Sequence, residues 1–279
     1  MERLTEKKLK LLEEKALHIR RSVIHMLAEA GSGHAAGPLG LADIFASLYF
    51  HVLRHNPAHP DWPHRDRLVL SNGHTCPALY AALAHAGYFP VSELKRLRKL
   101  GSPLQGHPHR GEVPGVETTS GPLGSGLSQA IGMALAAHLD RERRFVYVIT
   151  SDGEHDEGNY WEAVMYAGNH GYELSQLIVI VDRNNIQIDG NTEDVMALEP
   201  LAEKYRAFGW HVMHIDGHRH EAIIHAAAEA QAVYEAPSVI IAHTVPGKGV
   251  SFMEHDYRWH GRAPTKAEAA AALKELGSQ

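Results

Sequence analysis

The stretch FVYVITSDGEHDEGNYWEAVMYAGNHGYELSQLIVIVDRNN, residues 145–185, decides the fold. It contains two apolar runs, 145–150 and 177–181, which are rich in valine and isoleucine and do not alternate with polar residues. This pattern is typical of strands that are buried on both faces, as in a parallel sheet. A helical pattern over 160–169 separates the two runs. The stretch therefore predicts a crossover unit of strand, helix and parallel strand.

The rest of the chain repeats this alternation. Three more apolar runs predict strands at 67–70, 210–215 and 238–245. Helical patterns lie between the strands, at 126–138, 201–208 and 221–234. We therefore expect an α/β fold, with a mostly parallel sheet and helices on both faces, in a single domain over 1–279.

Each end of the chain predicts a helix. The N-terminal segment is amphipathic and ends at Gly31 and Gly33, and its apolar stripe consists of Leu9, Leu12, Ala16, Ile19, Val23 and Leu27. At the other end, Thr265 and Glu268 form the pattern of a capping box, and the helix that they begin ends at Gly277. This capped helix favours a natural end of the chain.

Composition narrows the classes of partner. The formal net charge of −6 argues against a nucleic-acid partner, because binding phosphate backbones requires a basic face. The charged N-terminus contains neither a signal peptide nor a membrane span. With Cys76 as its single cysteine, the chain forms no intramolecular disulfide, which fits a reducing compartment. We therefore expect a cytoplasmic protein that binds small molecules and no membrane.

Polar and glycine-rich segments follow every predicted strand. In chain order they are SNGH at 71–74, SDGE at 151–154, DRNN at 182–185, DGHRH at 216–220 and PGKG at 246–249. Because parallel strands end at the same edge of the sheet, and open sheets bind ligands there, these loops predict a single site.

Two of these loops predict a magnesium ion that holds a diphosphate. Asp152 and the amide oxygen of Asn184, with a nearby backbone carbonyl, provide the hard oxygen donors that Mg²⁺ prefers. Gly153 lets the backbone pass close to a phosphate. The alternative is that SDG and NN are only turns and helix caps, which is the commoner role of either motif alone.

Histidine is abundant, at 22 of 279 residues, and such an excess can signal metal binding. However, His51, His55, His59 and His64 lie in a proline-containing segment that we expect to be a loop, and they show no spacing typical of metal ligands.

The pair of oxygen-donor loops resembles the signature of the thiamine diphosphate enzymes, in which Gly-Asp-Gly is followed by an Asn, with Ser151 here in place of the first glycine. Four further stretches are similar to the transketolase family and occur in its order: GSGHAAGPLGLADIFASLYF (31–50), WPHRDRLVLSNGH (62–74), TSGPLGSGLSQAIGMALA (119–136) and WHG (259–261). The resemblance covers nearly the whole chain.

The resemblance implies a thiamine diphosphate-binding domain of the type that holds the diphosphate. The cofactors implied are thiamine diphosphate and Mg²⁺, with Ca²⁺ or Mn²⁺ as substitutes. The metal ligands implied are Asp152, Asn184 and the carbonyl of Ile186. The other cofactor contacts implied are Gly153 and Glu154 near the diphosphate, and Gly121 and Leu123 against the thiazolium and pyrimidine rings.

The resemblance also implies four active-site histidines. His74 and His260 are expected mainly at the diphosphate edge and the substrate oxygens, and His34 and His107 at the ketose hydroxyls. Imidazole suits these tasks because it titrates near neutral pH and can both donate and accept a proton. In the family, the positions of Glu157 and Glu162 lie at a dimer interface between two cofactors; a solvated helix face is the other interpretation.

The activity implied is transfer of a two-carbon ketol unit from a ketose or its phosphate to an aldose or its phosphate. Full transketolases continue into a pyrimidine-binding domain, which carries the glutamate that activates the cofactor, and a C-terminal domain. This chain holds only the first domain. We therefore expect the N-terminal subunit of a split transketolase, active only with a separate C-terminal subunit in an α2β2 assembly.

Several alternatives stay open. Within the same cofactor class, the chain could belong to a deoxyxylulose phosphate synthase or be the α subunit of a two-oxoacid dehydrogenase. It could also be a non-catalytic thiamine diphosphate-binding protein, or a histidine-rich protein that stores metal.

Overall fold

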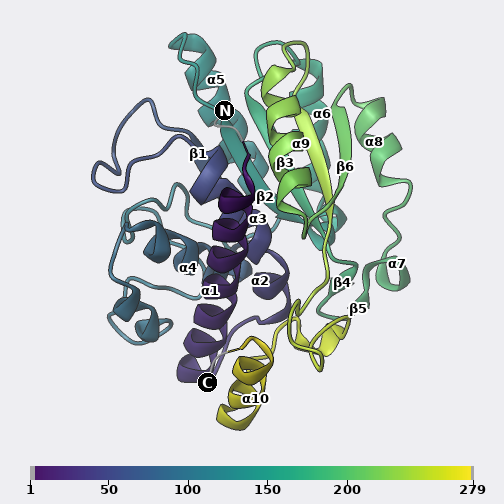
Figure 1. Ribbon diagram of the computed structural model, residues 1–279. Helices are drawn as coiled ribbons and strands as arrows, with labels where there is room; N and C mark the ends of the chain where they lie inside the picture. The colour runs from purple at the N-terminus through teal and green to yellow at the C-terminus, as the bar shows by residue number, and fades with distance from the viewer. Residues whose placement is uncertain (1–3, 278–279) are drawn as a thin grey trace.

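A five-stranded parallel sheet forms the centre of the computed structural model, which describes residues 4–277 (Figure 1). The strand order is β1-β2-β3-β7-β6. Its strands are β1 (Arg67–Leu70), β2 (Val146–Ser151), β3 (Leu177–Arg183), β6 (His211–Asp216) and β7 (Ser238–His243). A separate antiparallel pair consists of β4 (Ile186–Gln187) and β5 (Gly190–Asn191). All five predicted strands are present, so the predicted fold class is confirmed.

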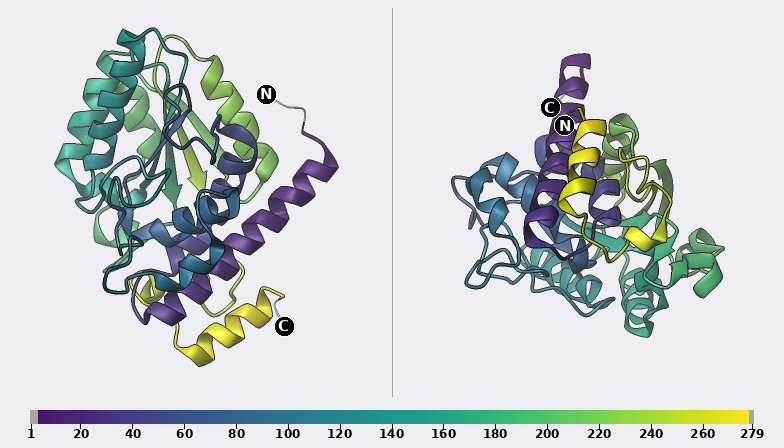
Figure 2. Two further views of the ribbon diagram at one scale, coloured as in Figure 1. Left: turned by 90° about the vertical axis from the view of Figure 1, so that its left-hand side faces the viewer. Right: turned by 90° about the horizontal axis from the view of Figure 1, so that it is seen from below.

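Helices cover both faces of this sheet. The main helices are α1 (Glu6–Ala30), α4 (Cys76–Ala86), α5 (Ser125–Leu139), α6 (Gly158–Asn169), α8 (Leu201–Ala207), α9 (His220–Ala232) and α10 (Lys266–Glu275). The left view of Figure 2 shows α5 and α6 on one side of the strands and α9 on the other. Alternate strand residues explain this arrangement: Val146 and Val148 belong to the core under α5 and α6, whereas Tyr147 and Ile149 belong to the core that includes α1 and α9.

Short elements complete the connections between the strands. The short α-helices are α2 (Ala36–Gly40), α3 (Ala42–Ser47) and α7 (Thr192–Val195). The 3₁₀ turns are η2 (Gly73–Thr75), η3 (Val91–Arg96), η4 (Asp152–Asp156) and η5 (Tyr257–Trp259), and the π-helical turn is η1 (Leu48–Val52). His51 therefore lies in this π-helical turn, and the prediction that it lies in a loop was wrong.

Both terminal helices agree with the sequence patterns. α1 ends at Gly31, which adopts a left-handed φ of 67°, and α10 begins at Thr265 with the expected capping box to Glu268. The predicted stripe of α1 is buried, except for Leu9, which is only partly covered. Within residues 4–277, no helix combines the length and apolar character needed to cross a membrane.

A buried ionic cluster joins the α1 and α3 layer to the sheet. The Arg20 guanidinium donates to both carboxylate oxygens of Asp43, and His218 Nδ1 lies 2.7 Å from Asp43 Oδ2. The Val245 amide donates to His218 Nε2 at 2.7 Å, so the proton of the ring is on Nδ1, where it is donated to Asp43. Burial alone would raise the pKa of Asp43, but the hydrogen bond from His218 and the charge and hydrogen bond of Arg20 lower it. The cluster therefore holds the loops after β6 and β7 against the N-terminal helices.

We expect Asp43→Asn to lower the free energy of unfolding at pH 7 by about 3–5 kcal/mol, because Arg20 would stay buried without a charged partner. Because the folded-state pKa of Asp43 is lowered, this stabilisation is present above the ordinary aspartate pKa of about 4 and is lost as the pH falls through the folded value. Urea unfolding measured from about pH 3 to about pH 7 tests both effects.

Glu203→Gln is the control, because the ion pair of Glu203 with Arg206 is exposed and is expected to contribute less than about 1 kcal/mol. An Asp43→Asn variant as stable at pH 7 as this control would contradict the assigned role of the cluster.

Candidate functional site

The parallel register brings the two oxygen-donor loops together. Ser151, the last residue of β2, pairs with Asp182 near the end of β3, so the residues that follow each strand emerge side by side. Asp152 Oδ2 accepts hydrogen bonds from the Asn185 amide at 2.7 Å and from Arg183 Nη1 at 3.1 Å. The loop after β3 therefore wraps around the Asp152 carboxylate.

The three predicted metal ligands lie at this junction. Asp152 has no exposed surface, and its burial raises the pKa of the carboxyl to about 6, although Arg183 opposes this shift. Asn184 is oriented from both ends of its amide: Nδ2 donates to Asp182 Oδ2 at 2.8 Å, and Oδ1 accepts from the Ile186 amide at 3.0 Å. The predicted carboxylate, amide and carbonyl ligands thus belong to two loops that are hydrogen-bonded to each other.

This donor set fits a magnesium ion that also binds phosphate oxygens. A divalent cation would stabilise the ionised form of Asp152, which burial otherwise disfavours. Among residues 4–277, no group of three or more His, Cys, Asp or Glu side chains is placed to hold a metal ion. A metal at this edge would therefore depend on the amide and carbonyl oxygens and on oxygens of the bound ligand.

Ser151 and Glu154 cap the short helix η4, as the turn interpretation expected. Ser151 adopts an extended conformation, with φ of −106°, so the serine at the usual glycine position is accommodated without strain. Its side chain and that of Glu154 form a capping box. Asp152, in contrast, directs its carboxylate to the loop after β3.

The Glu154 carboxylate joins three segments that are distant in sequence. It accepts hydrogen bonds from Ser71 Oγ at 2.6 Å, the Gly124 amide at 2.9 Å and the Ser151 amide at 3.0 Å. These donors lie after β1, before α5 and at the end of β2. Because the side chain has no exposed surface and all its contacts are internal, Glu154 is placed to position the loop after β2.

Three of the four predicted histidines form one cluster at the same edge. The ring centroid of His34 lies 4.9 Å from that of His74 and 5.5 Å from that of His260, and the His74 and His260 centroids are 5.1 Å apart. These side chains come from the loop after α1, from η2 after β1, and from the segment after η5. Residues far apart in the chain therefore present adjacent imidazoles.

The fourth histidine and Gly121 pack beside this cluster, against Gly73. A Cβ atom at Gly73 would lie 2.6 Å from Ser120 Cβ, 3.2 Å from His107 Cδ2 and 3.3 Å from the Gly121 nitrogen. Gly73 is thus required for the close approach of the loop that carries His107 and Gly121. Leu123, two residues further on, is partly buried.

The environment of the histidines favours their neutral forms. Burial, followed by the charges of His260, Arg98 and His107, lowers the pKa of His34 to about 4. Burial is also the main cause that lowers the pKa values of His74, His107 and His260. A neutral imidazole has one donor and one acceptor nitrogen, so at neutral pH each ring can bind a hydroxyl by either nitrogen and a phosphate oxygen by its N–H.

Two buried polar side chains at this edge have groups that the chain itself leaves unsatisfied. Within the described residues, His34 Nδ1 and both amide atoms of Asn72 are buried and have no hydrogen-bond partner. Such groups are costly unless a bound molecule or water satisfies them. Asn72 lies in the SNGH segment, of which the sequence assigns only His74, so the polar run after the strand was the signal that could have identified it.

Sequence reasoning also missed Ile188 and Arg183. Ile188 is 64% exposed although apolar, and a Cβ atom at Gly261 would lie 3.6 Å from its Cδ1 and 3.8 Å from His34 Nε2. The segment after the Asn184 loop thus reaches the histidine cluster. Glu157 and Glu162, which flank the first turn of α6, are both exposed in the single chain, so their role at an interface stays a prediction.

Comparisons with known proteins agree with this geometry. The family model described as transketolase, thiamine diphosphate binding domain, matches residues 13–279. The 6-deoxy-6-sulfo-D-fructose transketolase subunit of Clostridium sp. is 44% identical over 265 residues, with 95% of this chain and 96% of the relative covered. An apulose-4-phosphate transketolase subunit of Phocaeicola vulgatus is 40% identical, with 93% of this chain and 92% of the relative covered.

Solved structures give the same result. Transketolase from Leishmania mexicana superposes with a TM-score of 0.90 at 37% identity, over 96% of this chain. This chain spans 41% of that longer protein. The family model and the two subunits of similar length confirm the predicted family, and the chain therefore belongs to the transketolase family, in its thiamine diphosphate binding domain.

Proposed function

We propose that this chain is the N-terminal subunit of a two-chain transketolase that transfers a two-carbon ketol unit from a ketose, or its phosphate, to an aldose. The observation that carries the proposal is the junction of the Asp152 and Asn184 loops beside the cluster of His34, His74 and His260. Its relatives of similar length are named as transketolase subunits, which supports a partner chain.

Asp152, Asn184 and the Ile186 carbonyl would hold Mg²⁺, and the same oxygen donors suit Ca²⁺ or Mn²⁺. Gly153 would place its backbone beside the diphosphate, and Gly121 and Leu123 would contact the rings of the cofactor. When bound, thiamine diphosphate supplies the carbanion chemistry by which the bond between C2 and C3 of the ketose breaks and forms.

The histidines would bind and orient the sugar. His74 and His260 would face the diphosphate edge, and His34 and His107 would contact ketose hydroxyls. His34 has a buried Nδ1 without a partner in the described chain, so that atom can hold a hydroxyl proton or donate its own. Because burial favours the neutral rings, each ring keeps one nitrogen that can accept a hydroxyl proton and one N–H that can donate to an oxygen.

The outer face of α5 and α6 supports assembly with further chains in an α2β2 complex. It exposes large apolar side chains that a lone globular chain would normally bury, namely Leu139, Met165 and Tyr166. Glu162 lies on α6 and Glu157 directly precedes this helix. Both carboxylates would therefore become partly buried if two copies of the chain met at this face. A partner chain with the pyrimidine-binding domain would supply the glutamate that activates the cofactor.

Calorimetric titration with thiamine diphosphate tests the cofactor site. We expect binding that requires Mg²⁺ and tightens when the partner chain is added. Asp152→Asn should weaken it by at least about 100-fold, because removal of one anionic ligand of a divalent cation costs several kcal/mol. Asp216→Asn is the matched control, since this exposed aspartate also ends a strand at the same edge.

If Asp152→Asn and Asp216→Asn bind thiamine diphosphate equally well, and circular dichroism shows that both are folded, the proposed metal site at Asp152 is wrong. If the chain binds the cofactor but no partner chain gives ketol transfer, a non-catalytic thiamine diphosphate-binding protein is favoured. Decarboxylation of a two-oxoacid by the reconstituted enzyme would instead place the chain with the two-oxoacid dehydrogenases or deoxyxylulose phosphate synthases.

The histidine roles are tested by turnover of the two-chain enzyme. We expect His34→Asn to lower kcat/KM for ketol transfer by about 100-fold, which is typical for loss of a group that positions and exchanges protons. Release of the shortened aldose from the donor ketose measures this.

His85→Asn controls for the loss of any buried imidazole. Burial, chiefly, lowers the pKa of His85 to about 4, as it does for His34, but this ring bonds to Ser22 away from the site. We expect its kcat/KM to stay within about twofold of the parent. Similar losses in both variants would mean that His34 acts only through stability.

A further inference from the structure

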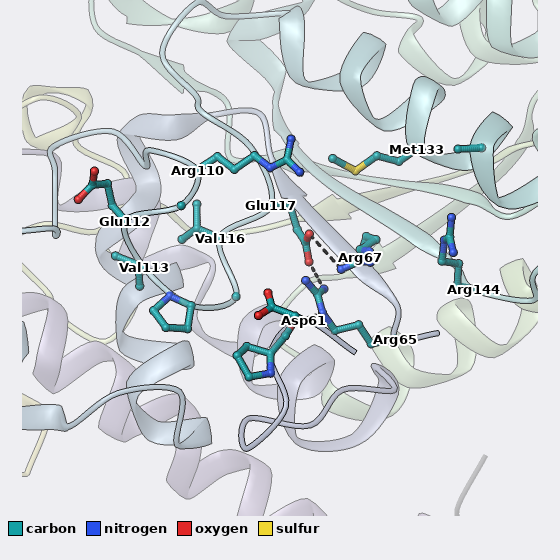
Figure 3. A pocket seen from close by; sticks show the side chains of 15 residues that line it. Asp61, Arg65, Arg67, Arg110, Glu112, Val113, Val116, Glu117, Met133 and Arg144 are labelled. Atoms are coloured by element: carbon teal, nitrogen blue, oxygen red, sulfur yellow. Dashed lines mark hydrogen bonds and ion pairs between the residues drawn. The ribbon is translucent and has the colours of Figure 1, made fainter. Parts of the chain in front are cut away.

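A cavity of about 610 Å³ lies beside β1, away from the cofactor edge (Figure 3). Its walls come from β1 and the segment before it, the loop between η3 and α5, the helix α5 and the segment between α5 and β2. Four arginines line it: Arg65, Arg67, Arg110 and Arg144. The volume lies within the range of pockets for small molecules.

Arg65 is well satisfied, since it also donates to the Pro60 and Asp66 carbonyls, but the other three arginines are only partly satisfied by the protein. Glu117, whose side chain is 9% exposed, pairs closely with Arg65 and contacts Arg67 at 3.5 Å. Arg144 makes contacts of 3.4 Å to the Pro63 carbonyl and 3.5 Å to Asp140 Oδ2. Arg110 has no side-chain hydrogen bond or ion pair with any residue of the described chain. Figure 3 draws Glu117 between Arg65 and Arg67, with Arg110 and Arg144 further out.

Because Arg67 and Arg144 are mostly buried, water cannot fully replace the hydrogen bonds that the protein does not provide. The side chains of Arg67 and Arg144 are 20% and 14% exposed, so most of their hydration is lost. Burial lowers the pKa of Arg67, and although Glu117 opposes this, the charges of Arg65 and Arg144 lower it further. Guanidinium groups have five donors each, and those that line one cavity and are short of acceptors can be satisfied by a multivalent oxyanion. The other two acidic residues of the lining, Asp61 and Glu112, are exposed to solvent.

The cavity is separate from the cofactor site. Arg67 begins β1, whereas Ser71 and His74 follow its end, so the length of the strand, on the order of 10 Å, lies between them. Apolar side chains also line it, among them Val113, Val116 and Met133, which would suit a carbon skeleton.

We propose that this cavity binds a small organic anion, whose phosphate-type group is held by Arg67, Arg110 and Arg144 and whose carbon part contacts Val113 and Val116. Arg65 stays paired with Glu117 and shapes the floor of the site. The proposal does not depend on the ketol-transfer activity, because none of these residues belongs to the cofactor edge.

Titration of the full chain tests this site with two probes, inorganic phosphate and phenyl phosphate. The buffer contains a chelator and no Mg²⁺, and the ionic strength is held constant with sodium chloride, because salt screens exposed charges. We expect one saturable site per chain, which phenyl phosphate fills more tightly because its ring contacts the apolar wall. Arg110→Gln should weaken Kd about tenfold, and Arg110→Gln combined with Arg144→Gln should weaken it further.

Two variants make the result specific. Arg206→Gln removes an exposed arginine elsewhere and should leave Kd unchanged. Asp152→Asn alters the cofactor edge and should also leave Kd unchanged. Absence of saturable binding, or equal Kd values for the parent and Arg110→Gln, overturns the proposal. Arg110 is exposed, so a folding defect cannot account for its effect, and unchanged urea unfolding verifies this.

Discussion

The parallel pairing of β2 with β3 is the constraint on which the rest of this chain depends. Both strands are buried along their whole length, and their polar residues gather at their carboxyl ends. Polar side chains therefore lie at the ends of the strands and in the residues that follow them, and the register of Ser151 opposite Asp182 fixes where those residues meet. Asp152 and Asn184 are therefore close because of backbone hydrogen bonds in the sheet, before any ligand is considered.

Buried ionisable side chains then connect the segments that the sheet alone does not. Glu154 links the ends of β1 and β2 to the start of α5, and Asp43 links the N-terminal helices to the loops after β6 and β7. Each carboxylate accepts several donors, so its burial is compensated locally. Removal of any single donor would leave part of a buried charge unsatisfied, which explains how such groups hold a loop in one position.

The sequence predicts the sheet well because burial on both faces leaves a strong local signature. A run such as 177–181, which is short, apolar and rich in isoleucine and valine, predicts a buried strand. The polar residues that follow such runs identify the edge of the sheet where ligands bind. Contacts between distant polar residues leave no such signature. Nothing near Ser71 indicates that it bonds to Glu154, and nothing near Asp43 indicates Arg20 or His218, because these partners are set by tertiary packing. For the same reason, the convergence of four arginines around one cavity could not be foreseen from their separate positions in the chain.

The contacts of Arg183 bear on whether this edge of the sheet can fold before an ion binds to it. Its guanidinium bonds to Asp152 on one side and to Glu193 and Glu199 on the other, so the chain itself already offsets part of the cost of burying the Asp152 carboxylate. The edge does not have to wait for an ion in order to fold. An ion or a cofactor would then bind to an edge whose loops are already held in place by contacts within the chain.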